Sequence, residues 1–184
     1  EAMLDANTDG ILEISKIYAE NQLAPAIMWW EDIAYRNGLL MAPETLSRLL
    51  IPRLQRVMKP LHKAAIKVIF HSDGNVQEPF LNHLIDSGID GLNPIQPDAG
   101  MDLAYIKEKY GDRLVLTGNL DTQTLLHGTF TDVKEKVKGC IKIAAPGSGY
   151  FFGTGAGQLV WDMPVENVIA MYKAVQKYGI YPKT

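Results

Sequence analysis

Short apolar runs alternate with longer amphipathic segments along most of the chain, and polar loops separate them. Each run is apolar almost without interruption, which is typical of strands whose two faces are both covered in a parallel sheet. We therefore predict strands over residues 25–30, 67–71, 91–95, 114–118 and 150–153.

The segments between these runs carry apolar residues at helical spacing. Pro43 fits the first turn of the longest one, whereas Pro52 and Pro60 are expected to bend or split it. Cys140 falls on the apolar stripe of its segment, so we expect it in the core. Helices are predicted over residues 43–61, 78–87, 101–110, 131–143 and 164–179, and a helical pattern also occupies residues 10–18.

Strands that alternate with helices predict a parallel sheet, either open and doubly wound or closed into a (β/α)8 barrel. Five βα units are too few for a complete barrel, which usually needs about 250 residues. The chain also begins with Glu1 rather than methionine. We therefore predict an α/β fold of the (β/α)8 TIM-barrel type, in which residues 1–184 form a single domain with about five C-terminal βα units of a longer barrel.

The composition narrows the class of protein. Hydrophobic residues make up 47% of the chain, which is enough for a packed core, and the net charge of −3 offers no basic surface for nucleic acid or anionic membranes. A single cysteine cannot form an internal disulfide, and neither a signal segment nor a long apolar span is present. We predict a cytoplasmic protein that binds neither nucleic acid nor membranes.

The strongest chemical signal is the run His71-Ser72-Asp73-Gly74-Asn75, which directly follows a predicted strand. Residues two positions apart point to the same side of a strand, so His71 and Asp73 form a candidate pair for metal binding or proton transfer. The alternative is a structural pair, in which Asp73 caps the turn and His71 bonds to it. We favour the functional interpretation, with His71, Asp73 and Asp32 as catalytic candidates.

Several segments, taken in order, resemble one family. They are Glu31-Asp32 after a strand, LLMAPE at 39–44, IFHSDGN at 69–75, YGDRLVLTGNLD at 110–121, LLHGT at 125–129 and MPVENVIAM at 163–171. The ordered set resembles the uroporphyrinogen decarboxylase superfamily over residues 29–181. The resemblance implies a (β/α)8 barrel and two known chemistries, the cofactor-free decarboxylation of haem synthesis and zinc-dependent methyl transfer from corrinoids.

The chain departs from both patterns. The methyltransferases bind zinc through a His-x-Cys strand end and a distant cysteine, but here Asp73 and Ala156 stand at those positions. The His-x-Cys zinc site is therefore absent, but His71 and Asp73 could still bind a divalent metal, zinc or another, with a further oxygen from Glu31 or Asp32. The decarboxylase needs no metal, and its early carboxylate-bearing strand has no counterpart here.

Other polar and aromatic residues at predicted strand ends are candidates for substrate binding, and some of them have a structural alternative. The Asn93 amide could bond to loop backbone instead, and Asp121 could cap a helix that begins near residue 122. Of Trp29 and Trp30, at most one can face the barrel interior. The substrate-binding candidates are Trp29, Glu31, Asn93, Asn119, Asp121 and Gly155.

These features favour an enzyme that transfers a methyl group to a thiol or another small acceptor. Its partners would be a methylated small molecule or a tetrapyrrole, and a corrinoid protein. Uroporphyrinogen decarboxylation is the first alternative, and a non-catalytic module that binds a tetrapyrrole or corrinoid is the second. Five strands leave two unpaired edges, so we also expect a homo-oligomer.

Overall fold

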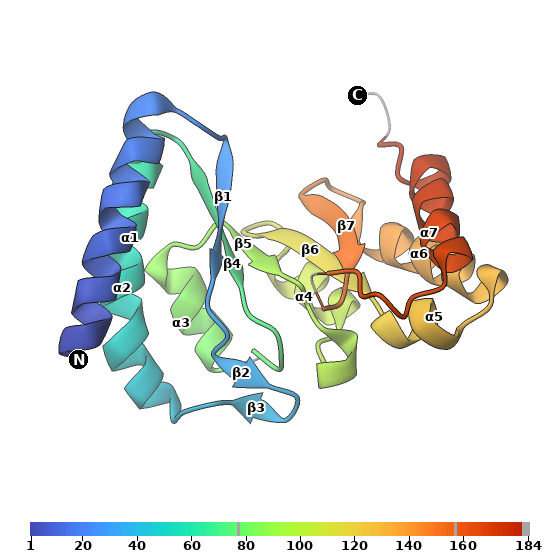
Figure 1. Cartoon of the computed structure of the whole chain (residues 1–184), viewed down its shortest axis with the longest axis horizontal. Coiled ribbons are helices and arrows are strands. Elements are labelled where there is room, and N and C mark those ends of the chain that lie inside the picture. The colour runs from blue at the N-terminus through green and yellow to red at the C-terminus, as the bar shows by residue number, and fades with distance from the viewer. Residues whose placement is uncertain (77, 157, 182–184) are drawn as a thin grey trace.

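The computed structural model describes residues 1–76, 78–156 and 158–181. In this part of the chain a parallel sheet has the strand order β1-β4-β5-β6-β7 (Figure 1). Its strands are β1 (Ala26–Trp30), β4 (Lys67–His71), β5 (Gly91–Asn93), β6 (Val115–Leu120) and β7 (Tyr150–Thr154).

Neighbouring strands in the sheet follow one another in the chain, and the order never reverses. A doubly wound sheet would contain a reversal, because its helices cover both faces. Steady progression in one direction instead curves the sheet towards a barrel with the helices outside. The predicted α/β fold of the partial TIM-barrel type is therefore confirmed.

Helices pack along the sheet. Figure 1 places α1 and α2 beside β1 and β4 at one end, and α6 and α7 beside β7 at the other. The α-helices of the described residues are α1 (Ala2–Asn21), α2 (Pro43–Lys63), α3 (Phe80–Ser87), α4 (Leu103–Tyr110), α5 (Thr122–His127), α6 (Phe130–Ala144) and α7 (Val165–Tyr178).

The α2 helix runs unbroken through Pro52 and Pro60, so the split is excluded and the bend stays a prediction. An interior proline costs about 3 kcal/mol because it removes a hydrogen bond and crowds the preceding turn. The buried face of α2 offsets that cost, since Leu54, Val57 and Leu61 are fully buried. Tertiary packing therefore decides the conformation here.

Three short elements were missed in whole or in part. The short strands β2 (Ala34–Tyr35) and β3 (Gly38–Leu39) form an antiparallel hairpin after β1. This hairpin lies against the turn after β4, where the Asn75 N–H donates to the Tyr35 carbonyl at 2.9 Å. The α5 helix was also missed apart from its expected start.

The core lies between the sheet and the helices. Phe70 of β4, Leu116 of β6 and Phe80 of α3 are fully buried there. Cys140 of α6 is also buried, which confirms its predicted place in the core. No helix in the described ranges is both long and apolar enough to cross a bilayer.

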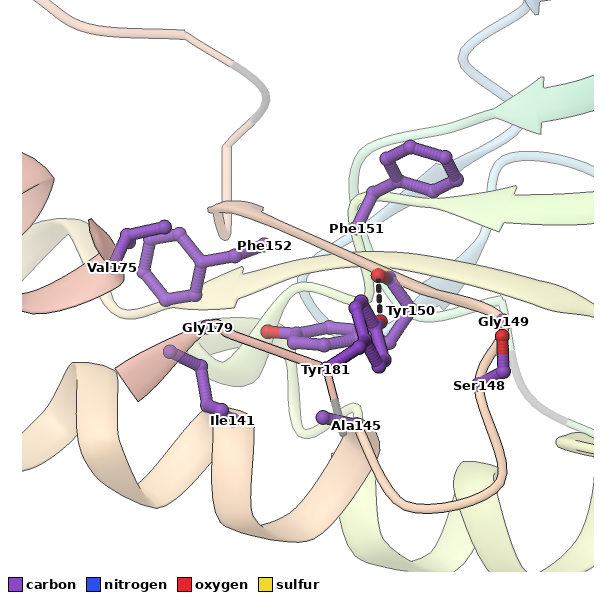
Figure 2. A pocket seen from close by; sticks show the side chains of 10 residues that line it. All are labelled: Ile141, Ala145, Ser148, Gly149, Tyr150, Phe151, Phe152, Val175, Gly179 and Tyr181. Carbon is purple, nitrogen blue, oxygen red and sulfur yellow. Dashed lines mark hydrogen bonds between the residues drawn. The ribbon is translucent and has the colours of Figure 1, made fainter. Parts of the chain in front are cut away.

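Strands β1 and β7 are the outer strands of the sheet, and each borders an apolar hollow. Residues of α1 and β1 line one of 420 Å³, and residues of α6, α7 and β7 line one of 340 Å³. Figure 2 shows the second hollow, where the Tyr181 hydroxyl donates to the Tyr150 carbonyl at 2.6 Å. The association expected from unpaired edges stays a prediction.

Candidate functional site

Three strands end side by side at the carboxyl edge of the sheet. Trp30 of β1 is aligned with His71 of β4, and His71 is aligned with Asn93 of β5. Side chains aligned across parallel strands share one face. The fold therefore gathers an indole, an imidazole and an amide at the edge where barrel enzymes carry their active sites.

His71 is held from two directions. Its side chain is only 2% exposed, and the Trp30 ring stacks on it with centroids 4.0 Å apart. Its Nδ1 lies 2.5 Å from the Oδ1 of Asn93, whose Nδ2 donates in turn to the Thr117 hydroxyl. Because an amide oxygen can only accept, Nδ1 must carry the proton of a neutral ring. The lone pair is then on Nε2.

The Nε2 atom of His71 faces two carboxylates. It lies 3.7 Å from Oδ1 of Asp32 and 3.9 Å from Oδ1 of Asp73. One ligand atom from each of the three residues lies within 4.8 Å of the others. The Oδ1 of Asp73 is buried without a hydrogen-bond partner, which is costly unless a cation compensates it. This triad of Asp32, His71 and Asp73 therefore fits a divalent metal, with one nitrogen and two oxygen ligands.

The turn after β4 positions these groups. The Asp73 N–H donates to Oδ1 of Asp32 at 2.9 Å, which holds the two acidic residues together. The Gly74 N–H donates to the Gln96 side chain at 2.7 Å. Gly74 has a φ of +90°, and a Cβ there would lie 2.6 Å from the backbone of Ala34. Gly74 therefore allows the hairpin of β2 and β3 to approach the triad.

Burial shifts the acid–base equilibria at the triad. Burial raises the pKa of Asp73, the charge of His71 lowers it, and the charge of Asp32 raises it again. Burial likewise raises the pKa of Glu31, and the charge of Asp32 adds to that effect. The accumulated negative charge is what a bound cation would relieve.

Comparison with known proteins identifies a family for this chain. The family model described as Uroporphyrinogen decarboxylase (URO-D) matches residues 1–178. The chain belongs to the URO-D family. A uroporphyrinogen decarboxylase of Coxiella burnetii (strain RSA 493 / Nine Mile phase I) is 29% identical, over 80% of this chain and 45% of that protein. A uroporphyrinogen decarboxylase of Legionella pneumophila (strain Corby) is 28% identical, over 76% and 38% respectively.

A solved structure that is similar to this chain carries a different name. A methyltransferase from Methanosarcina mazei matches with a TM-score of 0.66 and 28% identity, over 92% of this chain and 48% of that one. The chain thus spans about half the length, or less, of the relatives it matches. Membership of the URO-D family is clear, whereas the names of these relatives divide between two activities.

The triad of this URO-D family chain contains all three catalytic candidates from the sequence. Glu31, the alternative oxygen ligand, lies outside it, and its side chain is exposed to solvent. Trp29 is buried beside α1 and α2, so the structure favours core packing for this residue, and its contact with substrate stays a prediction. The side-chain alternation of β1 turns Trp30 inwards instead.

The amide candidates bond within the protein. Asn93 connects His71 to Thr117, as described above. Asn119 donates to the Ile95 carbonyl, which fixes the loop after β5. The Asn93 amide therefore bonds to side chains and not to loop backbone, and contact of either amide with substrate stays a prediction.

Asp121 and Gly155 also have structural explanations. Asp121 is the N-cap of α5 and accepts from the Gln123 N–H at 2.8 Å. A Cβ on Gly155 would lie 2.5 Å from the Pro97 side chain, so close packing against Pro97 already requires a glycine there. Gly157, at the end of the same glycine-rich segment, lies outside the described residues.

Trp30 and Thr117 were missed as site residues. Each side chain reaches His71 directly or through Asn93, across strands that are distant in the sequence. The two-residue alternation of β1 could have identified Trp30, since its partner in the sheet is a histidine. No pattern of neighbouring residues indicated a role for Thr117 in the site.

Replacing Asn93 with leucine is expected to release the ring of His71 from a single tautomer. The variant removes the acceptor for Nδ1–H, so the neutral ring should populate both tautomers. Nitrogen-15 NMR of the histidine side chains above the pH of protonation would measure this change. Asn93→Asp keeps an acceptor and should keep the wild-type tautomer; if Asn93→Leu also keeps it, the assigned bond is wrong.

Proposed function

We propose that this chain belongs to a methyltransferase that moves a methyl group to a thiol or another small acceptor. A divalent metal on Asp32, His71 and Asp73 would bind that acceptor. The observation that carries the proposal is the buried, unpartnered carboxylate oxygen of Asp73 beside Nε2 of His71. The likeness to the Methanosarcina mazei methyltransferase supports it.

The metal would act as a Lewis acid that makes the acceptor easier to deprotonate. The lone pair of the acceptor forms the new bond to the methyl carbon, and the methyl donor keeps the electron pair of the bond that breaks. Asp32 is 60% exposed at its side chain and can receive the proton of the acceptor. Trp30 covers the other side of His71 and excludes water from the ring.

The donor and the cellular setting are also proposals. A corrinoid protein is the proposed methyl donor, and the cytoplasm is the proposed compartment. The chain covers about half the length of its relatives, so the shape of the whole substrate cavity is a proposal as well.

Uroporphyrinogen decarboxylation is the second candidate, since the curated relatives carry that name. This reaction needs a proton donor and groups that bind the tetrapyrrole nitrogens, but no metal. The two candidates therefore make opposite predictions about metal dependence.

The test is a zinc titration of metal-free protein by calorimetry, followed by two assays with and without a chelator. One assay follows methyl transfer from methylcobalamin to a small thiol, and the other follows carbon dioxide release from uroporphyrinogen. Stoichiometric zinc and chelator-sensitive methyl transfer are the expected results. Carbon dioxide release without metal would decide for the decarboxylase. Zinc binding without either activity would leave a binding module and overturn the proposed catalysis.

A further inference from the structure

Ser72 stands between two members of the triad, His71 and Asp73, but is not one of the three candidate metal ligands. Successive side chains of an extended chain point to opposite sides, so Ser72 points away from the side that its two neighbours share. It is only 3% exposed. A buried hydroxyl is almost always hydrogen-bonded, and the partners of this one lie on the segments that carry the two carboxylates.

The hydroxyl of Ser72 joins these two segments. It accepts a hydrogen bond from the N–H of Ile33, the residue after Asp32, at 3.1 Å. It donates its own hydrogen to the carbonyl of Asp73 at 2.8 Å. Because Ser72 points away from the triad, it can act on a metal only through the position of the residues that bind the metal.

This hydroxyl is inserted where a backbone bond between β1 and β4 would otherwise form. The Glu31 N–H donates to the His71 carbonyl at 3.1 Å, as in a regular parallel ladder. Continued by two residues, the same ladder would bring the Ile33 N–H to the Asp73 carbonyl. Both of these groups bond to the Ser72 hydroxyl instead. The two segments are therefore kept apart by the width of one hydroxyl group.

A second side chain replaces the neighbouring bond of the ladder. The regular pattern would pair the Asp73 N–H with the Glu31 carbonyl, but this N–H donates to Oδ1 of Asp32 at 2.9 Å. The same Oδ1 lies 3.7 Å from Nε2 of His71. The regular ladder thus ends at the level of the triad, where the side chains of Ser72 and Asp32 take the place of backbone partners.

Loss of the hydroxyl would leave two backbone groups without partners. Ile33 is 4% exposed, so water has little access to its N–H. An unsatisfied buried N–H is costly, and the Asp73 carbonyl lies on the other side of the space that the hydroxyl fills. The two groups should therefore approach and bond directly, as in a regular ladder. That approach would move Asp32 and Asp73 from the positions in which they face His71.

We propose that Ser72 is a positioning residue for the metal triad. Its hydroxyl holds the ends of β1 and β4 apart and thereby sets the separation between the carboxylates of Asp32 and Asp73. The effect on metal affinity rests on the proposed function, because it requires a metal on these residues. The effect on the backbone does not, because the spacing exists in the metal-free chain. The two effects are therefore measured separately.

The backbone measurement uses metal-free Ser72→Ala. NMR detects a hydrogen bond through the coupling between the amide nitrogen and the carbonyl carbon that the bond joins. We expect a coupling between the Ile33 nitrogen and the Asp73 carbonyl carbon in this variant. The wild type should show none, because its Ile33 N–H donates to the hydroxyl. Ser72→Thr keeps a hydroxyl that donates and accepts, and should show no coupling either.

The metal measurement is a calorimetric zinc titration of the same proteins. Loss of a residue that orients a metal ligand costs about 10- to 100-fold in affinity, so Ser72→Ala should bind zinc at least about tenfold more weakly. Ser72→Thr should bind zinc as the wild type does. The matched control is Ser15→Ala, in α1. Ser15 is 2% exposed and its hydroxyl donates to the Ile11 carbonyl of the same helix at 2.9 Å, so zinc affinity should stay unchanged.

The outcomes separate this proposal from the proposed function. Wild-type zinc affinity in Ser72→Ala would overturn the positioning role, as would an equal loss in Ser15→Ala. A wild type that binds no zinc would contradict the proposed function alone. The positioning role would then stand if the direct bond between Ile33 and Asp73 forms in Ser72→Ala, and would be wrong if it does not. Circular dichroism establishes that each variant is folded.

Discussion

The His71→Ala variant is expected to bind zinc at least about 100-fold more weakly than the wild type and to lose metal-dependent methyl transfer. Loss of a residue that merely orients a metal ligand costs 10- to 100-fold in affinity, so loss of the ligand itself should cost at least the upper value. His71 is the single nitrogen donor of the triad, and the two carboxylates would remain without it. Calorimetric zinc titration and the methylcobalamin assay measure both effects.

The control for this variant is His127→Ala. His127 is the last residue of α5 and is exposed, so its loss should leave zinc affinity unchanged. Circular dichroism would establish that both variants remain folded. Wild-type zinc affinity in His71→Ala would mean that the metal, if bound, lies elsewhere.

The Gly118→Ala variant is expected to lose about 3 kcal/mol of the free energy of unfolding, or to fail to fold. Gly118 has a φ of +114°, which alanine rarely adopts, and an added Cβ would lie 1.7 Å from the Pro94 carbonyl oxygen. That oxygen belongs to the backbone after β5 and cannot move aside as a flexible side chain would. Urea denaturation followed by circular dichroism measures the loss.

A matched glycine makes this prediction specific. Gly10 lies inside α1, and a Cβ there would meet nothing within 4 Å. Gly10→Ala should therefore raise the free energy of unfolding by about 1 kcal/mol, because alanine favours the helix. Equal stability changes in the two variants would show that the close approach to Pro94 does not determine the effect.

The strands were predictable because burial on both faces leaves continuous apolar runs in the sequence. The bounds of the strands were less predictable. Strand β5 ends at Asn93 because Pro94 has no N–H to donate. Strand β6 extends to Leu120 through residues that are typical of a loop. The hairpin of β2 and β3 depends on contact with the turn at Gly74, and a pattern of neighbouring residues cannot reveal that contact.

The part of the site that lies within one short segment was predictable from the sequence. His71 and Asp73 lie two positions apart on one strand end, so the alternation of side chains was enough to pair them. The contribution of Asp32 and the stacking of Trp30 depend on the register between β1 and β4. Which of Trp29 and Trp30 points inwards stayed open, because two adjacent tryptophans on a buried strand give no sign of their orientation.

The hydrogen bond of Tyr181 has a consequence for how the sheet can grow. The Gly149 carbonyl accepts from Leu116 of β6, so the next carbonyl, that of Tyr150, points to the free edge of β7. The Tyr181 hydroxyl already occupies that carbonyl, and an added strand must displace it at a cost of about 1 kcal/mol. Pairing of a new strand with β7 should therefore start near Thr154 and proceed towards Tyr150. The hydrogen bond of Tyr181 would be broken in the last step.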